Sequence, residues 1–198
     1  MKLRTVVLIA TLCIATCGYA QTVMRIRGTV TSVDGNVLSI KTREGRDMKV
    51  QLAPDISFSY PKLIKLSDIK AGSAVGTSAV PGPDGKLIAR EVHVFPAGQP
   101  APNEGHRPWD LEPNSSMTNA EVSAVVQRNN GRELTLTYKG GSQVVEVPDN
   151  IPVVTAMPGD RSLLMPGASV FMQASMDNDG KVIASRVQVS KDGVRPPQ

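Results

Sequence analysis

The chain has 198 residues and carries 22 Lys and Arg against 18 Asp and Glu, a formal net charge of +4. This balance is too even to imply a polyanion partner. Aromatic residues make up only 4% of the chain. So few rings argue against a base-stacking surface for single-stranded nucleic acid, and we expect no nucleic-acid partner.

Residues 1–20 have the order of a secretory signal peptide. Lys2 and Arg4 precede an apolar run over residues 6–14, and small residues end the segment at Ala20. Removal of this segment leaves 20 basic against 18 acidic side chains, a net charge of +2. No later stretch has the roughly 20 apolar residues that cross a bilayer. We therefore expect a periplasmic protein without a transmembrane segment, and not a membrane permease.

Both cysteines, Cys13 and Cys17, lie in this first segment. The mature chain would then hold no cysteine for a disulfide, a thiolate metal site or a nucleophile. A minor alternative is lipid anchoring through Cys17, because "IATC" loosely resembles a lipoprotein cleavage box. Thr16 fits that box poorly, since the position before the cysteine usually holds Gly, Ala or Ser.

A sequence repeat organises the rest of the chain. The stretch "DGKLIAREVHV" (84–94) returns as "DGKVIASRVQV" (179–189), 95 positions later (179 − 84 = 95). In the same way "VQLAPDI" (50–56) matches "VEVPDNI" (145–151), and "AGSAV" (71–75) matches "PGASV" (166–170). Because the matches keep their order, the chain holds two related units of roughly 70 residues.

Each unit reads as a series of short strands. Apolar residues alternate with polar ones over 24–31, which is the period of a half-buried strand, with Arg25 and Arg27 on the polar face. Gly45 and Gly140 mark tight hairpin turns. In chain order we expect strands over 24–31, 38–42 and 48–52, a helical turn within 61–72, and strands over Ser73–Val80 and Lys86–Phe95, with the same series in the second unit.

About five short strands in roughly 70 residues favour a small closed barrel, because closure removes exposed sheet edges. We therefore expect an all-β protein with two tandem five-stranded OB-like barrels, or alternatively SH3-like barrels, joined by a Pro-rich linker. The predicted organisation is a signal peptide over 1–20, a first barrel over 21–95, a linker over 96–118, a second barrel over 119–191 and a flexible tail over 192–198.

The predicted linker holds the one tryptophan of the chain, Trp109. A passive spacer has no need of this residue, so we expect its ring either to anchor the linker on a barrel or to form a binding face with His106 and Arg107. Phe58 and Tyr60 are further candidates for lining a binding groove. A basic patch around one hairpin of the first unit, diluted by acids, offers weak attraction for an anionic envelope polymer or lipid; it consists of Lys41, Arg43, Arg46 and Lys49.

Metal binding is the alternative chemistry. His93 and His106 with Asp110 could surround a divalent ion, although their spacing is not that of a typical zinc site. His93 stands at a polar strand position, which also fits an ordinary outward-facing residue. Met172 and Met176 lie four apart and share a strand face, where their thioethers could hold Cu(I) or simply fill the core.

The segments "GTVTSVDGNVLSI", "LSDIKAGSAV" and "DGKLIAREVHV" resemble a secreted bacterial small β-barrel family of unknown function with an OB-like fold. The whole mature chain is similar to two-repeat exported proteobacterial proteins that share the linker "GHRPWDLEP…MTNA". This resemblance implies a barrel without established catalytic residues. Related proteins are sometimes labelled as components of metal transport.

These observations lead to one expected function and one alternative. No serine elbow or comparable catalytic motif is present, so we expect neither catalysis nor a cofactor. The expected protein is a non-catalytic exported envelope protein that acts as a binding or structural module, with an envelope protein or another envelope component as its partner. The alternative is a periplasmic metal-binding accessory protein of metal transport or homeostasis.

Overall fold

The computed structural model describes residues 23–129 and 131–196. The predicted signal peptide and Cys17 lie outside these residues. The described part of the chain is built from strands and two short 3-10 turns, so the predicted all-β class is confirmed. None of its helical segments is long and apolar enough to span a membrane.

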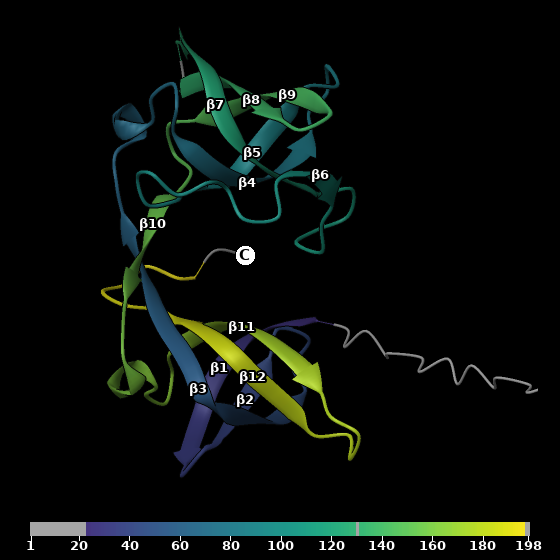
Figure 1. The fold of residues 1–198 in the computed structure, drawn as a ribbon, viewed down its shortest axis with the longest axis vertical. Coiled ribbons are helices and arrows are strands. Elements are labelled where there is room, and N and C mark those ends of the chain that lie inside the picture. Colours follow the sequence, from purple (N-terminus) through teal and green to yellow (C-terminus); the bar gives the residue numbers. More distant parts are fainter. Residues whose placement is uncertain (1–22, 130, 197–198) are drawn as a thin grey trace, which may run out of the picture.

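The elements follow the predicted repeat (Figure 1). The first unit contains β1 (Met24–Asp34), β2 (Val37–Thr42), β3 (Asp47–Leu63), η1 (Leu66–Asp68), β4 (Ala74–Pro81) and β5 (Leu87–Val94). A short strand, β6 (Gly105–Pro108), comes next. The second unit contains β7 (Ser116–Arg128), β8 (Gly131–Tyr138), β9 (Gly141–Pro148), β10 (Val153–Pro158), η2 (Arg161–Leu163), β11 (Ser169–Met176) and β12 (Val182–Val189).

Glycine sits where the hairpins turn most tightly. Gly45, between β2 and β3, has a φ of +80°, and Gly140, between β8 and β9, has a φ of +96°. Only glycine adopts this left-handed region without steric cost. Both predicted turns are therefore confirmed, and with them the meander of three strands that opens each unit.

The first barrel is a closed ring of five strands. β1, β2 and the N-terminal part of β3 form an antiparallel meander. β11 pairs antiparallel with β1, and β12 lies between β11 and β3, parallel to β3. The core inside this ring consists of Ile26, Val30, Leu38, Ile40, Val50, Leu52, Leu164, Val170, Met172, Ala174, Ala184, Val187 and Val189.

The pairings of β4, β5, β7, β8 and β9 close a second ring in the same order. β7, β8 and β9 form the meander, β4 pairs with β7, and β5 lies between β4 and β9, parallel to β9. We call this ring the second barrel. Its core consists of Ile69, Val75, Ala79, Ala89, Val92, Ala120, Val122, Leu134, Leu136, Val145, Val147 and Val153.

The strand pairing differs from the predicted tandem arrangement. Each unit contributes its first three strands to one barrel and its last two strands to the other. Neither of the predicted barrel ranges, 21–95 and 119–191, therefore forms a closed barrel by itself within its described residues. The physical reason lies in β3 and β10, which leave their own barrel and satisfy their backbone groups by pairing with each other instead of turning back.

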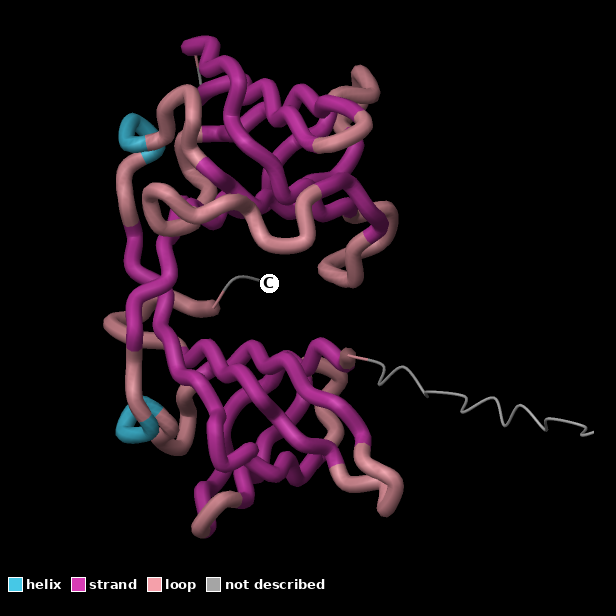
Figure 2. Tube along the Cα trace, viewed as in Figure 1, coloured by secondary structure: helices cyan, strands magenta, loops and turns pink. Residues whose placement is uncertain are grey.

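This crossover is nearly symmetric. Pro61 of β3 pairs with Ala156 of β10, and these two positions are equivalent in the repeat (61 + 95 = 156). The pairs on either side, Tyr60 with Met157 and Lys62 with Thr155, exchange under the same relation. Figure 2 shows the two segments crossing between the barrels, with η1 and η2 at opposite ends. The crossover therefore lies on a pseudo-two-fold axis that relates the repeats.

The predicted linker and tail contain regular structure. β6 lies within 96–118 and pairs with the start of β7, which itself begins at Ser116 inside that range. At the predicted tail, Val194 exchanges backbone hydrogen bonds of 3.1 and 2.9 Å with Lys191, the residue just before the tail. Proline density in the linker therefore did not prevent the pairing that holds β6 against β7, whereas the pairing at the tail is local.

Candidate functional site

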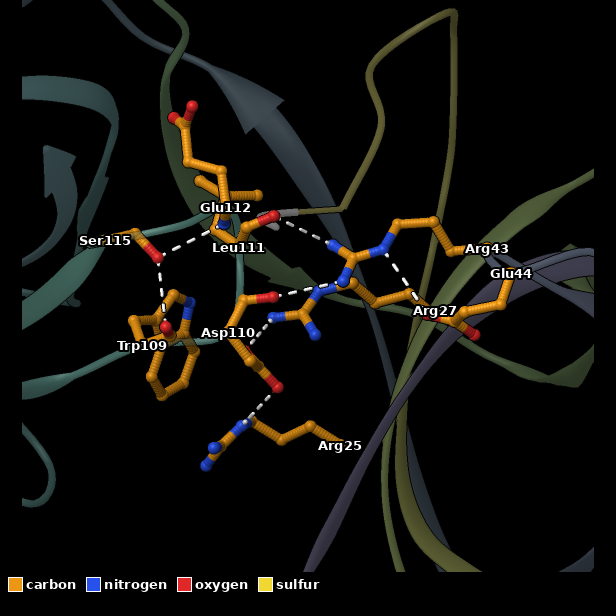
Figure 3. Close-up of polar contacts among 9 residues, drawn as sticks. All are labelled: Arg25, Arg27, Arg43, Glu44, Trp109, Asp110, Leu111, Glu112 and Ser115. Carbon is orange, nitrogen blue, oxygen red and sulfur yellow. Dashed lines mark hydrogen bonds and ion pairs between the residues drawn. The ribbon is translucent and has the colours of Figure 1, made fainter.

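A cluster of arginines surrounds Trp109 where the loop after β6 meets the first barrel (Figure 3). The guanidinium carbon of Arg25 lies 4.3 Å from the centroid of the indole ring, that of Arg107 lies 5.8 Å away and that of Arg27 lies 5.9 Å away. These distances fall within the range of cation–π attraction. We call Arg25, Arg27, Arg107, Trp109 and Asp110 the Trp109 junction.

Arg27 is the most deeply placed member of the Trp109 junction. Its side chain is 7% exposed, and its guanidinium carbon lies 5.0 Å from the ring centroid of Phe171 as well as 5.9 Å from that of Trp109. Nη2 donates a hydrogen bond of 2.9 Å to Asp110, whereas Nε has no hydrogen-bond partner within the described residues. A buried arginine of this kind depends strongly on its one carboxylate.

Asp110 forms ion pairs with two arginines of β1, Arg25 and Arg27. Its Oδ1 accepts from Arg27, and its Oδ2 accepts from Nε of Arg25 at 3.2 Å. Partial burial raises the pKa of Asp110, but the hydrogen bonds and charges of Arg27 and then Arg25 outweigh it, so the pKa lies below its usual value. Asp110 therefore stays ionised in mildly acidic as well as neutral solution.

The loop that carries Trp109 and Asp110 ties the two barrels together. Arg43, from the turn after β2 of the first barrel, donates to the backbone oxygens of Asp110 and Leu111 at 3.1 and 3.2 Å. On the other side Glu112 accepts from Arg90 of β5, in the second barrel, at 2.6 Å. The Trp109 loop thus packs onto the first barrel while it remains part of the second.

The predicted trio of Trp109, His106 and Arg107 comes together only in part. Arg107 stands over the indole ring, and burial, followed by the charge of Arg25, lowers the pKa of its guanidinium. His106 instead directs Nδ1 to the hydroxyl of Thr118, 2.8 Å away on β7. Partial burial, followed by the charge of Arg107, lowers the pKa of His106.

Phe58 and Tyr60 occupy a different part of the molecule. Phe58 lies on β3 where this strand pairs with Val187 of β12, and it packs against the first core, whereas Tyr60 lies further along β3, in the segment that pairs with β10. Lys191 places its ammonium 4.1 Å from the centroid of the Tyr60 ring. Within the described part of the chain, neither ring makes an aromatic or cation–π contact with a residue of the Trp109 junction.

Arg25 and Arg27 are the junction residues that the sequence did not reveal as candidates. Alternation placed them correctly on the outer face of β1, with Ile26 turned toward the core. A solvated outer face was the simplest expectation for them. In the structure, the Trp109 loop covers this face. The only feature of the sequence that could have indicated this contact is a pair of arginines on one strand face in a chain with a single tryptophan.

The residues proposed as metal ligands are spread over the structure. Met172 is fully buried in the first core, whereas Met176, on the same strand face, is 52% exposed at the end of β11. His93 lies on β5 of the second barrel, and Asp110 pairs with arginines. Within the described residues, no group of three or more His, Cys, Asp or Glu side chains gathers as a metal site would require.

His93 is half-buried, which corrects the expectation of an ordinary outward-facing residue. It sits on β5 between Gly76 of β4 and Val154 of β10, and its ring centroid is 5.0 Å from that of Phe95. The crossover strand β10 covers the position, just as β3 pairs with the equivalent residue, Gln188, in the first barrel. This burial lowers the pKa of His93 to about 4.

The lowered pKa of His93 predicts a loss of stability in mild acid. The unfolded chain, with a histidine pKa near the ordinary 6.5, binds the proton more readily than the folded chain between pH 6.5 and 4. The contribution is present above pH 6.5 and is lost as the pH falls toward 4. Going from pH 7 to pH 5 should lower the free energy of unfolding by about 1–2 kcal/mol through this group.

Denaturant unfolding at the two pH values measures this effect. His93→Gln is the matched variant, because glutamine occupies the equivalent position, Gln188, in the second repeat. The variant should lose less stability between pH 7 and pH 5 than the unaltered protein. An equal loss in both proteins would contradict the assignment to His93.

An open groove of about 1030 Å³ lies on the second barrel, beside the loop that follows β5. Its wall includes Tyr138 and Ser123, and charges of both signs surround it, among them Lys70, Glu104 and Glu121. Glu104 is engaged, since its Oε1 accepts from the backbone N–H of Lys139 at 2.7 Å. With Asp68, three acids and one lysine line the groove, so its charge is mainly negative, opposite in sign to that of the Trp109 junction.

No protein-family model, no curated protein and no solved structure matches this chain. The resemblance to a secreted OB-like family therefore stays a prediction.

Proposed function

We propose that this protein is a non-catalytic exported envelope protein, and that the Trp109 junction binds a carboxylate- or phosphate-bearing envelope component. The observation that carries the proposal is an excess of positive charge on one aromatic ring. Three guanidinium groups lie within 5.9 Å of the indole centroid, and the ion pairs that they make within the described residues all go to Asp110.

Guanidinium groups suit such a ligand because their planar donors match the oxygens of carboxylates and phosphates. Arg107 is the member best placed to provide them. Its Nη1 donates to the neutral backbone oxygen of Asn103 at 2.8 Å, and within the described part of the chain Arg107 forms no ion pair. Although the mature chain as a whole is nearly balanced in charge, the fold brings three of its arginines to this one ring.

The strand order supports the OB-like alternative over the SH3-like one. In both rings a three-stranded meander is closed by two further strands, the last of which runs parallel to the third strand of the meander. This is the order of a five-stranded Greek-key barrel of the OB type. We propose that assignment for both barrels.

Trp109 provides the test, because it is the only tryptophan and its fluorescence reports directly on the junction. The mature chain is titrated with polyphosphate in one arm and polyglutamate in the other, with neutral dextran as the blank. A saturable change with one polyanion identifies phosphate or carboxylate as the preferred group. Arg107→Gln should weaken that binding about tenfold, because a hydrogen bond to a charged group is worth about 1.5–3 kcal/mol.

Arg128→Gln is the matched control, since Arg128 lies at the far end of β7 and pairs with Glu133. It removes the same charge outside the junction and should leave the affinity nearly unchanged. Equal weakening in both variants would mean general attraction to a cationic protein. No change of Trp109 fluorescence with either polyanion would overturn the proposal.

A further inference from the structure

We infer that the two halves of the chain, residues 23–95 and 116–190, are complementary association partners that hold together without the covalent link between them. The partner that each half fits is another repeat of the same kind. This inference is independent of the proposed ligand, since it rests on the strand exchange alone.

Neither half contains a complete barrel. Four pairings that close the two rings, β1 with β11, β3 with β12, β4 with β7 and β5 with β9, join strands of different halves. Val30 and Leu38 of the first half are covered in the core by Met172 and Val187 of the second. A half on its own would expose this apolar surface, and the other half buries it completely.

The contact between the halves has the symmetry of a homodimer interface. At the crossover, Pro61 pairs with Ala156, the equivalent residue of the other repeat. The two equivalent strands, β3 and β10, thus pair with each other about the pseudo-two-fold axis. A contact in which one surface meets a copy of itself is the isologous type, which closes a pair and goes no further. The chain therefore has the architecture of a strand-exchanged dimer whose two subunits are joined in one polypeptide.

The core positions that the halves exchange are almost interchangeable. Val75 of β4 and Val170 of β11 are repeat equivalents, and both are buried. The other equivalent buried pairs are Ala79 with Ala174, Ala89 with Ala184 and Val92 with Val187. Other positions differ: Thr77 stands in the second barrel where Met172 stands in the first, and buried Val80 corresponds to Ser175. Such similarity is what a repeat needs in order to recognise another copy of itself.

The link between the halves begins and ends on the second barrel. Phe95 donates its backbone N–H to Ala74 at the start of β4, and Ser116 pairs with Ala79 at the other end of the same strand. The Trp109 loop within the link contacts both barrels, and the covalent connection itself adds to the association of the halves by raising their effective concentration.

A cut in the link tests the inference on the full chain. A protease recognition sequence is inserted between the exposed residues Gln99 and Pro100, and the folded protein is then cleaved. We expect both fragments to elute together at the size of the uncut protein. The melting temperature of the cut protein should rise with protein concentration, while that of the uncut protein stays constant, because unfolding now separates two chains.

Fragments that separate into folded monomers, or that melt independently of concentration, would overturn the inference. If the cut protein is unstable, an engineered disulfide provides a second test of which strands pair. Thr29 of β1 faces Ser169 of β11, whereas a barrel made from one repeat would place Ala74, the equivalent of Ser169, at that position. The chain has no other cysteine beyond residue 17, so an engineered pair has no competing thiol in the mature protein.

In the exchanged fold, T29C/S169C should oxidise and link the two fragments on a non-reducing denaturing gel after cleavage. The matched variant T29C/A74C should stay reduced, because those strands belong to different barrels. The reverse pattern would show that each repeat folds on itself, and would overturn the inference without bearing on ligand binding at the Trp109 junction.

Discussion

Replacing Leu38 by alanine is expected to lower the free energy of unfolding by about 2–5 kcal/mol, the usual cost of truncating a buried leucine. Leu38 is fully buried on β2, at the centre of the first core, with strands of both repeats around it. The lost side chain would leave a cavity that a closed five-stranded ring cannot easily collapse to fill. Denaturant unfolding followed by circular dichroism measures the change.

The strand exchange adds a second expectation for this variant. Leu134 is the repeat equivalent of Leu38 in the second core, and it is also fully buried. Because each barrel is completed by strands from both repeats, Leu38→Ala and Leu134→Ala should each shift one common unfolding transition. Two separate transitions, of which Leu38→Ala moves only one, would contradict the coupling of the barrels.

Val126→Ala is the control for the core variants. Val126 is 41% exposed on β7, so its truncation removes little buried surface. Its effect should stay within about 0.5 kcal/mol, as for most surface substitutions. A loss as large as that of Leu38→Ala would show that burial does not govern these costs.

Removing the carboxylate of Asp110 is expected to have the second large effect, a loss of about 2–4 kcal/mol of folding stability. Breaking a buried ion pair by deleting one partner costs about 3–5 kcal/mol, and water at the half-exposed Asp110 offsets part of this. Asp110→Ala would leave Arg27, with its side chain 93% buried (100 − 7 = 93), without its ionic partner. Thermal and denaturant unfolding at neutral pH measure the loss.

A double variant separates charge burial from lost packing. Arg27→Met with Asp110→Ala removes both charges and should recover most of the stability that Asp110→Ala loses, because an apolar side chain replaces a buried pair at little cost. Glu112→Ala is the matched control. Glu112 is an exposed neighbour that pairs with exposed Arg90, so its loss should cost at most about 1 kcal/mol. Equal losses for Glu112→Ala and Asp110→Ala would contradict the role given to Arg27.

Much of the local structure could be predicted from the residues alone. Alternation over 24–31 placed Ile26 and Val30 inside and Arg25 outside, as the structure has them. The turn glycines Gly45 and Gly140 were predicted because positive φ suits glycine alone. These features depend on residues that are close in the sequence, so the local sequence pattern is enough to predict them.

The candidate site was predicted only in part. Trp109 stood out because it is the one tryptophan in a segment that needed none, and Arg107 lies beside it in sequence. Arg25 and Arg27, which supply the remaining guanidinium groups, are more than 80 residues away from their partner Asp110. Nothing in the pattern of β1 indicates that a distant loop covers its polar face.

Local pattern is enough to predict the repeat, the strand periods, the turns and many of the apolar core positions. It cannot predict which barrel each pair of closing strands completes, because equivalent residues such as Val75 and Val170 are both valines buried in a barrel core. The choice follows from β3 and β10, which pair with each other at Pro61 and Ala156 and so carry each chain segment across to the other barrel. The burial of Arg27 and His93 was likewise decided in three dimensions, since segments distant in sequence cover both residues.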